Sequence, residues 1–475
     1  MPFSGNCGRN RIRSSSPVES CPSRLFSAGR GPGARASLGM RDFLKSASPG
    51  TFLPGASDLP GRVFQPLSPT FRNLPFSCLC GTMQSDRKHP GGVPITITDV
   101  KTHIISAPLE EPFQFSQGWV HKRSSLIVEV ITREGLSGFG ECLCHGMQPP
   151  QIAAAFIDHC FRGRMIGRDI RDVEVIWEDL YNVSRPFGQQ GAAVNALSGV
   201  DIALWDAMGR SLGQPVSRLL GGNFRTAVKA YATGFYRKKG RSYPREAMDE
   251  AQGYLDKGFR GMKLKTGFGV GDDIAYIRAL RRAVGPDVML MADFNCAYNQ
   301  SAARRIILEL EEEKLEFFEE LLAPEDMAGY AALRNLTPSY IAAGENIFGK
   351  IAYKDWLARG ALDIYQPDLC SSGGFTECKK IAALTQAHNA MLIPHVWGSG
   401  VGLAASLQFI ATLPPTPLSQ TPWEPLLEYD QSSHPFRLDL IGDGVVFRDG
   451  FVQVPTGPGI GVEVNRSVLE KYRVS

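Results

Sequence analysis

The chain has 475 residues, of which 43% are apolar and 21% charged, enough for two or three domains or for one large α/β barrel with additions. No apolar run reaches the roughly 18–20 residues of a membrane-spanning helix, so we expect no membrane partner. The net charge is +3, but residues 1–82 alone carry +7, which leaves −4 for the rest of the chain. A mildly acidic body gives no electrostatic basis for binding nucleic acid, so we exclude that class of partner.

The first 92 residues are rich in Ser, Gly, Pro and Arg and poor in acidic residues, a composition typical of segments that bury too little apolar surface to fold. They also lack the apolar core of a secretory signal. We predict a disordered or non-native extension outside the fold. Three origins stay open: a disordered segment, a transit peptide, or a true translation start at Met83.

Cysteine usage indicates the compartment. Six of the ten cysteines lie beyond residue 92, and neither "CLC" motif has the two-residue spacing of a zinc knuckle. We therefore expect reduced thiols in a cytoplasmic protein.

Beyond Val93 the pattern predicts strands and then helices. Residues 95–105 and 124–135 alternate or are β-branched, as strands are, and 135–143 supplies turn glycines. Residues 150–167 and 192–213 have helical periodicity, and the second segment ends in a glycine that is a plausible stop signal. This part of the chain is therefore predicted to be an α+β unit.

From about residue 228, short apolar segments alternate with helical ones, which predicts a parallel sheet. Eight strands spaced by roughly 25 residues favour a closed barrel over an open sheet. The predicted strands are 228–235, 261–267, 288–295, 317–320, 340–346, 362–368, 390–396 and 425–430.

Three carboxylates follow three consecutive predicted strands. Asp293, Glu319 and Glu345 are each 26 residues apart, and strand ends of a barrel converge on one face. Such a cluster would repel itself without a cation, and oxygen-only ligands favour Mg²⁺ over zinc. We predict a magnesium site there.

Two lysines, Lys263 and Lys265, stand two residues apart on one apolar strand and so point to the same face. Burial and a neighbouring ammonium both lower the pKa of a lysine, so we predict that one acts as a base near neutral pH. The other is expected to pair with an anionic substrate.

His395 and Asp368 end neighbouring predicted strands, so the carboxylate is placed to orient the imidazole and raise its pKa, giving a second acid or base. Glu428 ends the last strand. It either orients substrate and assists acid chemistry or is an ordinary strand-end acid.

The segments "KLK", "ADFN", "FFEE", "GEN", "QPD" and "PHVWG", with the helix "ALSGVDIALWDAMGRSLGQPVSRLLGG", resemble the mandelate racemase/muconate lactonizing enzyme branch of the enolase superfamily. The resemblance covers about residues 94–475. It implies an α/β fold, a (β/α)₇β TIM-like barrel with an α+β capping domain, and Mg²⁺ on the three carboxylates. It also implies Lys265 as one base and the His395–Asp368 pair as the other.

The implied domain organisation has four parts. They are an extension (1–92), the capping domain (93–227), the barrel (228–430) and a C-terminal segment returning to the capping domain (431–475).

In this family, capping segments also contact the substrate, here the predicted loops 110–123 and 184–191. The candidate substrate contacts are Trp119, His121, Arg185 and Gln189.

The resemblance implies removal of a proton α to a carboxylate. Within the branch, "KTGFGVGDD", "QPDLCSSGGFTE" and "IPHVWGSGVGLAASLQF" favour cycloisomerisation of a sugar lactone. Dehydration of an acid sugar, and racemisation or epimerisation, are the alternatives. A non-catalytic barrel that only binds is the alternative of another class. The expected partners are a small sugar acid or lactone and further copies of the chain.

Overall fold

The computed structural model describes residues 93–417 and 419–474, which belong to one compact unit, Asp86–Ser475. The prediction for residues 1–92 lies outside the described residues. Within the described part of the chain, none of the helices combines the length and the apolar character needed to cross a membrane.

Eight parallel strands form the barrel, as predicted. The first seven strands pair in chain order, each with the next, and the eighth pairs with the first; among the described residues no ladder of hydrogen bonds joins the seventh strand to the eighth. The strands are β4 (Ala227–Gly234), β6 (Gly261–Lys265), β7 (Met289–Asp293), β8 (Phe317–Glu319), β9 (Tyr340–Ala343), β10 (Ile364–Tyr365), β11 (Met391–Leu392) and β12 (Leu427–Asp430).

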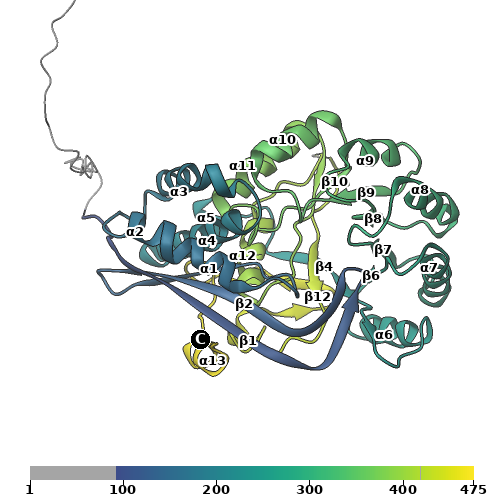
Figure 1. Ribbon diagram of the computed structural model, residues 1–475, viewed down its shortest axis with the longest axis horizontal. Helices are drawn as coiled ribbons and strands as arrows, with labels where there is room; N and C mark the ends of the chain where they lie inside the picture. The colour runs from purple at the N-terminus through teal and green to yellow at the C-terminus, as the bar shows by residue number, and fades with distance from the viewer. Residues whose placement is uncertain (1–92, 418, 475) are drawn as a thin grey trace, which may run out of the picture. The chain divides into compact units, whose positions relative to one another are not determined.

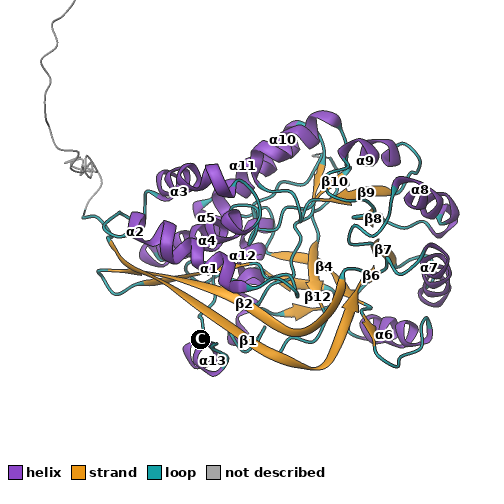
Figure 2. Ribbon diagram, in the orientation of Figure 1, coloured by secondary structure: helices purple, strands orange, loops and turns teal. Residues whose placement is uncertain are grey.

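One helix follows each of the first seven strands, which gives the (β/α)₇β order, and these helices surround the strands (Figures 1 and 2). The helices are α6 (Arg245–Asp256), α7 (Val270–Val284), α8 (Gln300–Glu309), α9 (Met327–Arg334), α10 (Gly349–Arg359), α11 (Gly374–Ala387) and α12 (Gly400–Ala411). A short 3₁₀ turn, η2 (Glu311–Glu313), follows α8.

Successive side chains of β6 point to opposite faces of the sheet, one toward the apolar core and one toward the candidate site. Met262 and Leu264 belong to the large apolar core that includes residues of the surrounding helices. Lys263 and Lys265, on the opposite face of the strand, are also buried. Inside the barrel, an apolar cluster that includes Tyr231 fills the space between the strands. The barrel is therefore a packed core, and its polar residues gather where the strands end.

The capping domain begins with three antiparallel strands, β1 (Ile97–Phe115), β2 (Gly118–Thr132) and β3 (Ser137–Cys142). Helices follow, as predicted, and the longest of them ends at Gly213, whose φ of 62° only glycine adopts without strain. The helices are α1 (Pro150–Phe156), the π-helical turn η1 (Ile157–Phe161), α2 (Arg162–Met165), α3 (Val173–Gly188), α4 (Ala192–Leu212) and α5 (Val216–Leu219).

Both predicted capping loops are largely regular structure instead. Residues 110–123 form the end of a β1–β2 hairpin that reaches toward β6 in Figure 1, and β5 (Arg237–Lys238) pairs with β1 there. Residues 184–191 begin in the last turn of α3. The loop prediction was wrong because pairing with the barrel segment β5 extends the hairpin, which the local sequence does not reveal.

Only some of the glycines in residues 135–143 lie in turns. Gly135 lies in a turn and has a φ of 81°, whereas Gly138 and Gly140 lie inside β3. A Cβ atom on Gly138 would stand 2.2 Å from the carbonyl oxygen of Ala203, and one on Gly140 would stand 2.0 Å from that of Gly199. These glycines therefore let α4 pack directly against the strand backbone.

The C-terminal segment touches both parts of the unit. It contains a 3₁₀ turn, η3 (Gly442–Gly444), strands β13 (Phe447–Arg448) and β14 (Phe451–Gln453), and helix α13 (Arg466–Lys471). β14 pairs antiparallel with β4, and the backbone N–H of Val474 donates to the carbonyl of Ile104 in β1 at 2.9 Å. The limits assigned to the four parts stay predictions.

We expect Gly140→Ala to lower the free energy of unfolding by about 1–3 kcal/mol, because the added methyl group overpacks the contact between β3 and α4. Urea denaturation measures this. Gly163→Ala in α2 is the control, since nothing lies within 4 Å of its Cβ position. It should stabilise by roughly 0.5–1 kcal/mol. Wild-type stability in Gly140→Ala would contradict the close packing.

Candidate active site

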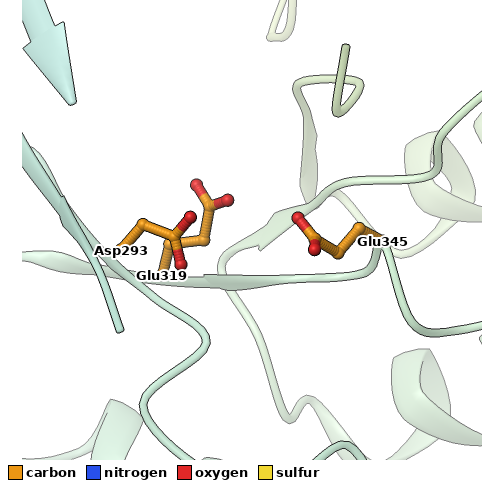
Figure 3. Close-up of side chains that lie close together, drawn as sticks. All are labelled: Asp293, Glu319 and Glu345. Atoms are coloured by element: carbon orange, nitrogen blue, oxygen red, sulfur yellow. The ribbon is translucent and has the colours of Figure 1, made fainter. Parts of the chain in front are cut away.

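Asp293, Glu319 and Glu345 lie together at the ends of β7, β8 and β9 (Figure 3). All three are buried, and one oxygen from each lies within 4.8 Å of the others. Their strands are adjacent in the sheet and run in parallel, so their carboxyl ends meet. Burial, together with the charge of Asp293, raises the pKa of Glu319 to about 7 although Lys263 opposes the shift.

The donor set fits a magnesium ion. It offers oxygen atoms only, which Mg²⁺ prefers. Oε2 of Glu345 is buried and accepts no hydrogen bond that meets the geometric criteria among the described residues, although Nε2 of His395 lies 3.2 Å away, so this oxygen is available as a ligand. Asp293, Glu319 and Glu345 would hold the ion.

Lys263 is fully buried between two carboxylates. Its ammonium lies 2.7 Å from Glu319 and 2.7 Å from Glu428. Burial opposes its charge, but these two acids outweigh burial and raise the pKa of Lys263 well above its usual range. Lys263 is therefore a fixed positive charge beneath the site.

Lys265 contacts Asp293 and lines the cavity described below. Burial and the charge of Lys263 lower its pKa, as the sequence argument assumed, but Asp293 outweighs both, and with protein charges alone the pKa of Lys265 is raised. The argument from the sequence left out this carboxylate, and the role of a lysine as a base stays a prediction.

The structure brings His395 and Asp368 together. Nδ1 of His395 lies 2.6 Å from Oδ2 of Asp368, and Nε2 lies 3.2 Å from Oε2 of Glu345. Burial opposes the imidazolium, but Glu345, Glu428 and Asp368 raise the pKa of His395 to about 10. Asp368 therefore fixes the ring, and Nε2 points toward the carboxylate cluster.

Glu428 connects the last strand to the first. Its side chain accepts hydrogen bonds from Thr233 of β4 at 2.7 Å and from the backbone N–H of Val396 at 3.2 Å. Burial opposes its charge, but Lys263 and His395 hold the pKa of Glu428 at about 2. It is therefore an ionised link between Lys263 and the segment that carries His395.

A cavity of about 30 Å³ lies beside these groups. That space holds one or two water molecules, so a sugar acid fits only after the surrounding residues move. The lining residues are Phe115, His145, Gly146, Tyr236, Lys265, Asn295, Glu345, His395 and Trp397.

Of the four predicted substrate contacts, none lines this cavity. Trp119 is half-buried and His121 exposed on β2, their rings stacked with centroids 6.3 Å apart. Arg185 and Gln189 are exposed at the end of α3, with the Arg185 guanidinium over the Tyr181 ring. The capping domain instead contributes Phe115, Gly146 and His145 to the lining.

Sequence reasoning missed several buried polar residues near the carboxylates. Gln366, in the "QPD" segment, donates to Glu319 at 2.8 Å, and Glu320 accepts from Asn346 at 2.8 Å. Asn295 and Glu320 have positive φ angles, 43° and 46°, a strain that non-glycine residues show mainly at functional sites. For Glu320, the sequence offered one signal: it directly follows Glu319, a predicted magnesium ligand. For His145, which lies on a capping segment, the sequence offered no such signal.

Two family descriptions match the chain. Residues 97–221 match the mandelate racemase/muconate lactonizing enzyme N-terminal domain, and residues 246–468 match the enolase C-terminal domain-like family. A D-galactarolactone cycloisomerase of Agrobacterium fabrum is 39% identical over 80% of this chain and 99% of its own length. The chain belongs to the enolase superfamily. The resemblance that the motifs indicated is thereby confirmed.

Other members of the superfamily agree in fold. The crystal structure of a 3,6-anhydro-D-galactonate cycloisomerase from Zobellia galactanivorans is 33% identical, with a TM-score of 0.72 over 80% of this chain and all of that one. A racemase from Streptomyces coelicolor, crystallised with bound magnesium, is 27% identical, with a TM-score of 0.70 over 80% of this chain and all of that one.

Acid-sugar dehydratases also occur among the relatives. A D-galactonate dehydratase of Verminephrobacter eiseniae is 32% identical over 73% of this chain and 91% of its own length. The chain is therefore an enzyme of the acid-sugar branch of the enolase superfamily.

We expect Mg²⁺ to raise the melting temperature of the protein, since an ion that binds only the folded state stabilises it by about 2.7 kcal/mol at 100 times its Kd. Glu345→Gln should abolish the shift by removing one ligand. Glu463→Gln, which changes an exposed acid paired with Arg210, should keep it. Scanning calorimetry with and without MgCl₂ measures both. An undiminished shift in Glu345→Gln would contradict the site.

Proposed function

We propose that this enzyme removes the α-proton of a sugar-acid carboxylate with the help of Mg²⁺ and then expels a β-oxygen. The proposed reaction is the ring-opening cycloisomerisation of an aldarolactone such as D-galactarolactone to a 3-deoxy-2-keto acid. One observation carries the proposal: Lys265 and His395, from β6 and from the end of β11, line the same cavity as Glu345 of the carboxylate cluster.

The reaction balances without a co-reactant. A base takes the α-proton, and the electron pair of that C–H bond forms a C=C bond to the β-carbon. The bond from the β-carbon to the lactone ring oxygen breaks, and this oxygen leaves as a carboxylate. The resulting enol takes a proton on the former β-carbon while its hydroxyl loses one, which gives the 2-keto acid; counted as free acids, product and substrate are isomers.

The side chains divide this work. A bound Mg²⁺ would supply Lewis-acid polarisation of the substrate carboxylate. Lys265 and His395 are the proton-transfer groups, and Asp368 holds the His395 ring through Nδ1 so that Nε2 faces the cavity. Lys263 adds a positive charge to the site. Its ammonium stays protonated and in place because it is paired with both Glu319 and Glu428.

Dehydration of an open-chain sugar acid is the second candidate, supported by the dehydratases among the relatives. The two reactions differ in the leaving group. A carboxylate leaves without a proton, whereas hydroxide must be protonated as it leaves. The second proton-transfer group is therefore more important for dehydration than for opening of a lactone.

The deciding experiment incubates the protein and Mg²⁺ with a panel of aldarolactones and open-chain sugar acids and measures release of 2-keto acid. We expect turnover of an aldarolactone, with a product of unchanged mass. Loss of water from an open-chain acid would favour the dehydratase. Failure of every lactone and every acid would contradict the proposal.

We expect Lys265→Ala and His395→Asn each to lower kcat by at least about 100-fold, because positioned general acids and bases contribute roughly 10²–10⁴-fold. In D₂O, only the variant that keeps the abstracting base should still exchange the substrate α-proton. Lys257→Ala, an exposed lysine on the outside of the barrel, is the matched control. Near-normal kcat in both site variants would remove these residues from the mechanism.

A further inference from the structure

The end of capping strand β3 contacts the barrel segment that follows His395. Glu141, fully buried in β3, accepts a hydrogen bond from the Ser399 backbone N–H at 2.8 Å and one from the Ser399 hydroxyl at 2.6 Å. It also accepts one from the Gly402 backbone N–H at 2.8 Å and one from Ser125 of β2 at 2.9 Å. Two of these groups are backbone N–H groups at the start of α12, where a carboxylate is favoured.

The same strand end also reaches the segment that follows Asp368. The backbone N–H of Leu143, two residues after Glu141, donates to the carbonyl of Cys370 at 3.0 Å. The backbone N–H of Cys370 in turn donates to Oδ1 of Asp368 at 2.6 Å. One short stretch of the capping domain is therefore bonded to the loops that carry both members of the His395–Asp368 pair.

Capping of α12 accounts for only part of the role of Glu141, which accepts the Gly402 N–H but also binds the Ser399 hydroxyl and Ser125. Ser399 caps α12 with its own side chain, which accepts from the Val401 N–H at 3.3 Å. Space around Glu141 is also restricted, since a Cβ atom on Gly398 or on Gly402 would stand 3.0 Å from its oxygens. The carboxylate thus fixes the backbone between His395 and α12 in a single arrangement.

A second capping residue holds the same segment from the other side. Arg123 of β2 is buried, donates to the Trp397 carbonyl at 2.8 Å, and stacks its guanidinium 3.6 Å from the centre of the indole ring. Trp397 lines the cavity, two residues from His395. The segment from Trp397 to Gly402 is therefore held by side chains of the capping domain.

We propose that Glu141 is a positioning residue for the His395–Asp368 pair, so that docking of the capping domain on the barrel sets the geometry of one proton-transfer group. Glu141 does not line the cavity. It acts through Ser399 and Gly402. The kinetic part of the test rests on the proposed function, whereas the spectroscopic part needs no substrate.

The experiment compares Glu141→Gln with wild type. An amide side chain cannot accept all four bonds, because its NH₂ group is a donor. The readout is the far-downfield proton resonance of the imidazole N–H that faces Asp368, assigned by its loss in His395→Asn. Asp206→Asn is the matched control: Asp206 is another buried capping carboxylate, it accepts backbone N–H bonds from Phe139 and Ile460, and it lies on neither loop.

We expect Glu141→Gln to shift or broaden the imidazole resonance and to lower kcat by about 10–100-fold with little change in KM, since misplacement by about 1 Å costs up to 10²-fold. Asp206→Asn should leave the resonance in place. If Glu141→Gln does not fold, Ser125→Ala removes one of the four bonds without touching the cap of α12 and should give the same effects on a smaller scale.

An unchanged resonance in folded Glu141→Gln, or in Ser125→Ala where the first variant does not fold, would overturn the proposal. An equal change in Asp206→Asn would overturn it too, because the effect would then be a general loss of packing. If no substrate is turned over by wild type, the proposed function fails while the resonance still decides the role of Glu141.

Discussion

The structure depends on burying several carboxylates side by side at one end of the barrel. Counted as ionised, Asp293, Glu319, Glu345, Asp368 and Glu428 carry five negative charges, against three positive charges on Lys263, Lys265 and protonated His395. Glu320 is counted as neutral, because burial raises its pKa well above its usual range. The two remaining negative charges match one divalent cation. Buried unpaired charge is strongly unfavourable, so the ammonium groups stabilise the fold, and a divalent ion bound there would stabilise it further.

Strand register explains how these charges come to be neighbours. Lys265 pairs in register with Asp293, and Asp293 with Glu319, so three adjacent strands carry a cation and two anions in one row. Lys263 lies two residues earlier on the same face, where it reaches Glu319 and Glu428. The 26-residue spacing between the carboxylates is thus the length of one repeating unit, which consists of a strand, a helix and the loops that connect them.

This regularity made the barrel and its acids predictable from the sequence. The capping contributions were not predictable, because they arise from tertiary packing: the β1–β2 hairpin extends where β5 pairs with it, and His145 reaches the cavity only through docking of the two domains. The effect of Asp293 on the pKa of Lys265 was missed for a similar reason. Its nearest charge, Asp293, belongs to the neighbouring strand and not to its own.

The two ends of the capping domain contact the barrel in different ways. At the hairpin tip, Ser116 and Gln117 donate to backbone carbonyls of Phe294 and Asn295 through side chains on the surface of the interface. At the other end, buried Glu141 contacts the start of α12, and buried Asp201 accepts from the Thr376 N–H in the first turn of α11 at 3.0 Å. Segments with few buried contacts open at lower free energy than buried ones. By this argument the contacts of the hairpin tip open at lower free energy than the buried contacts that Glu141 and Asp201 make with the barrel.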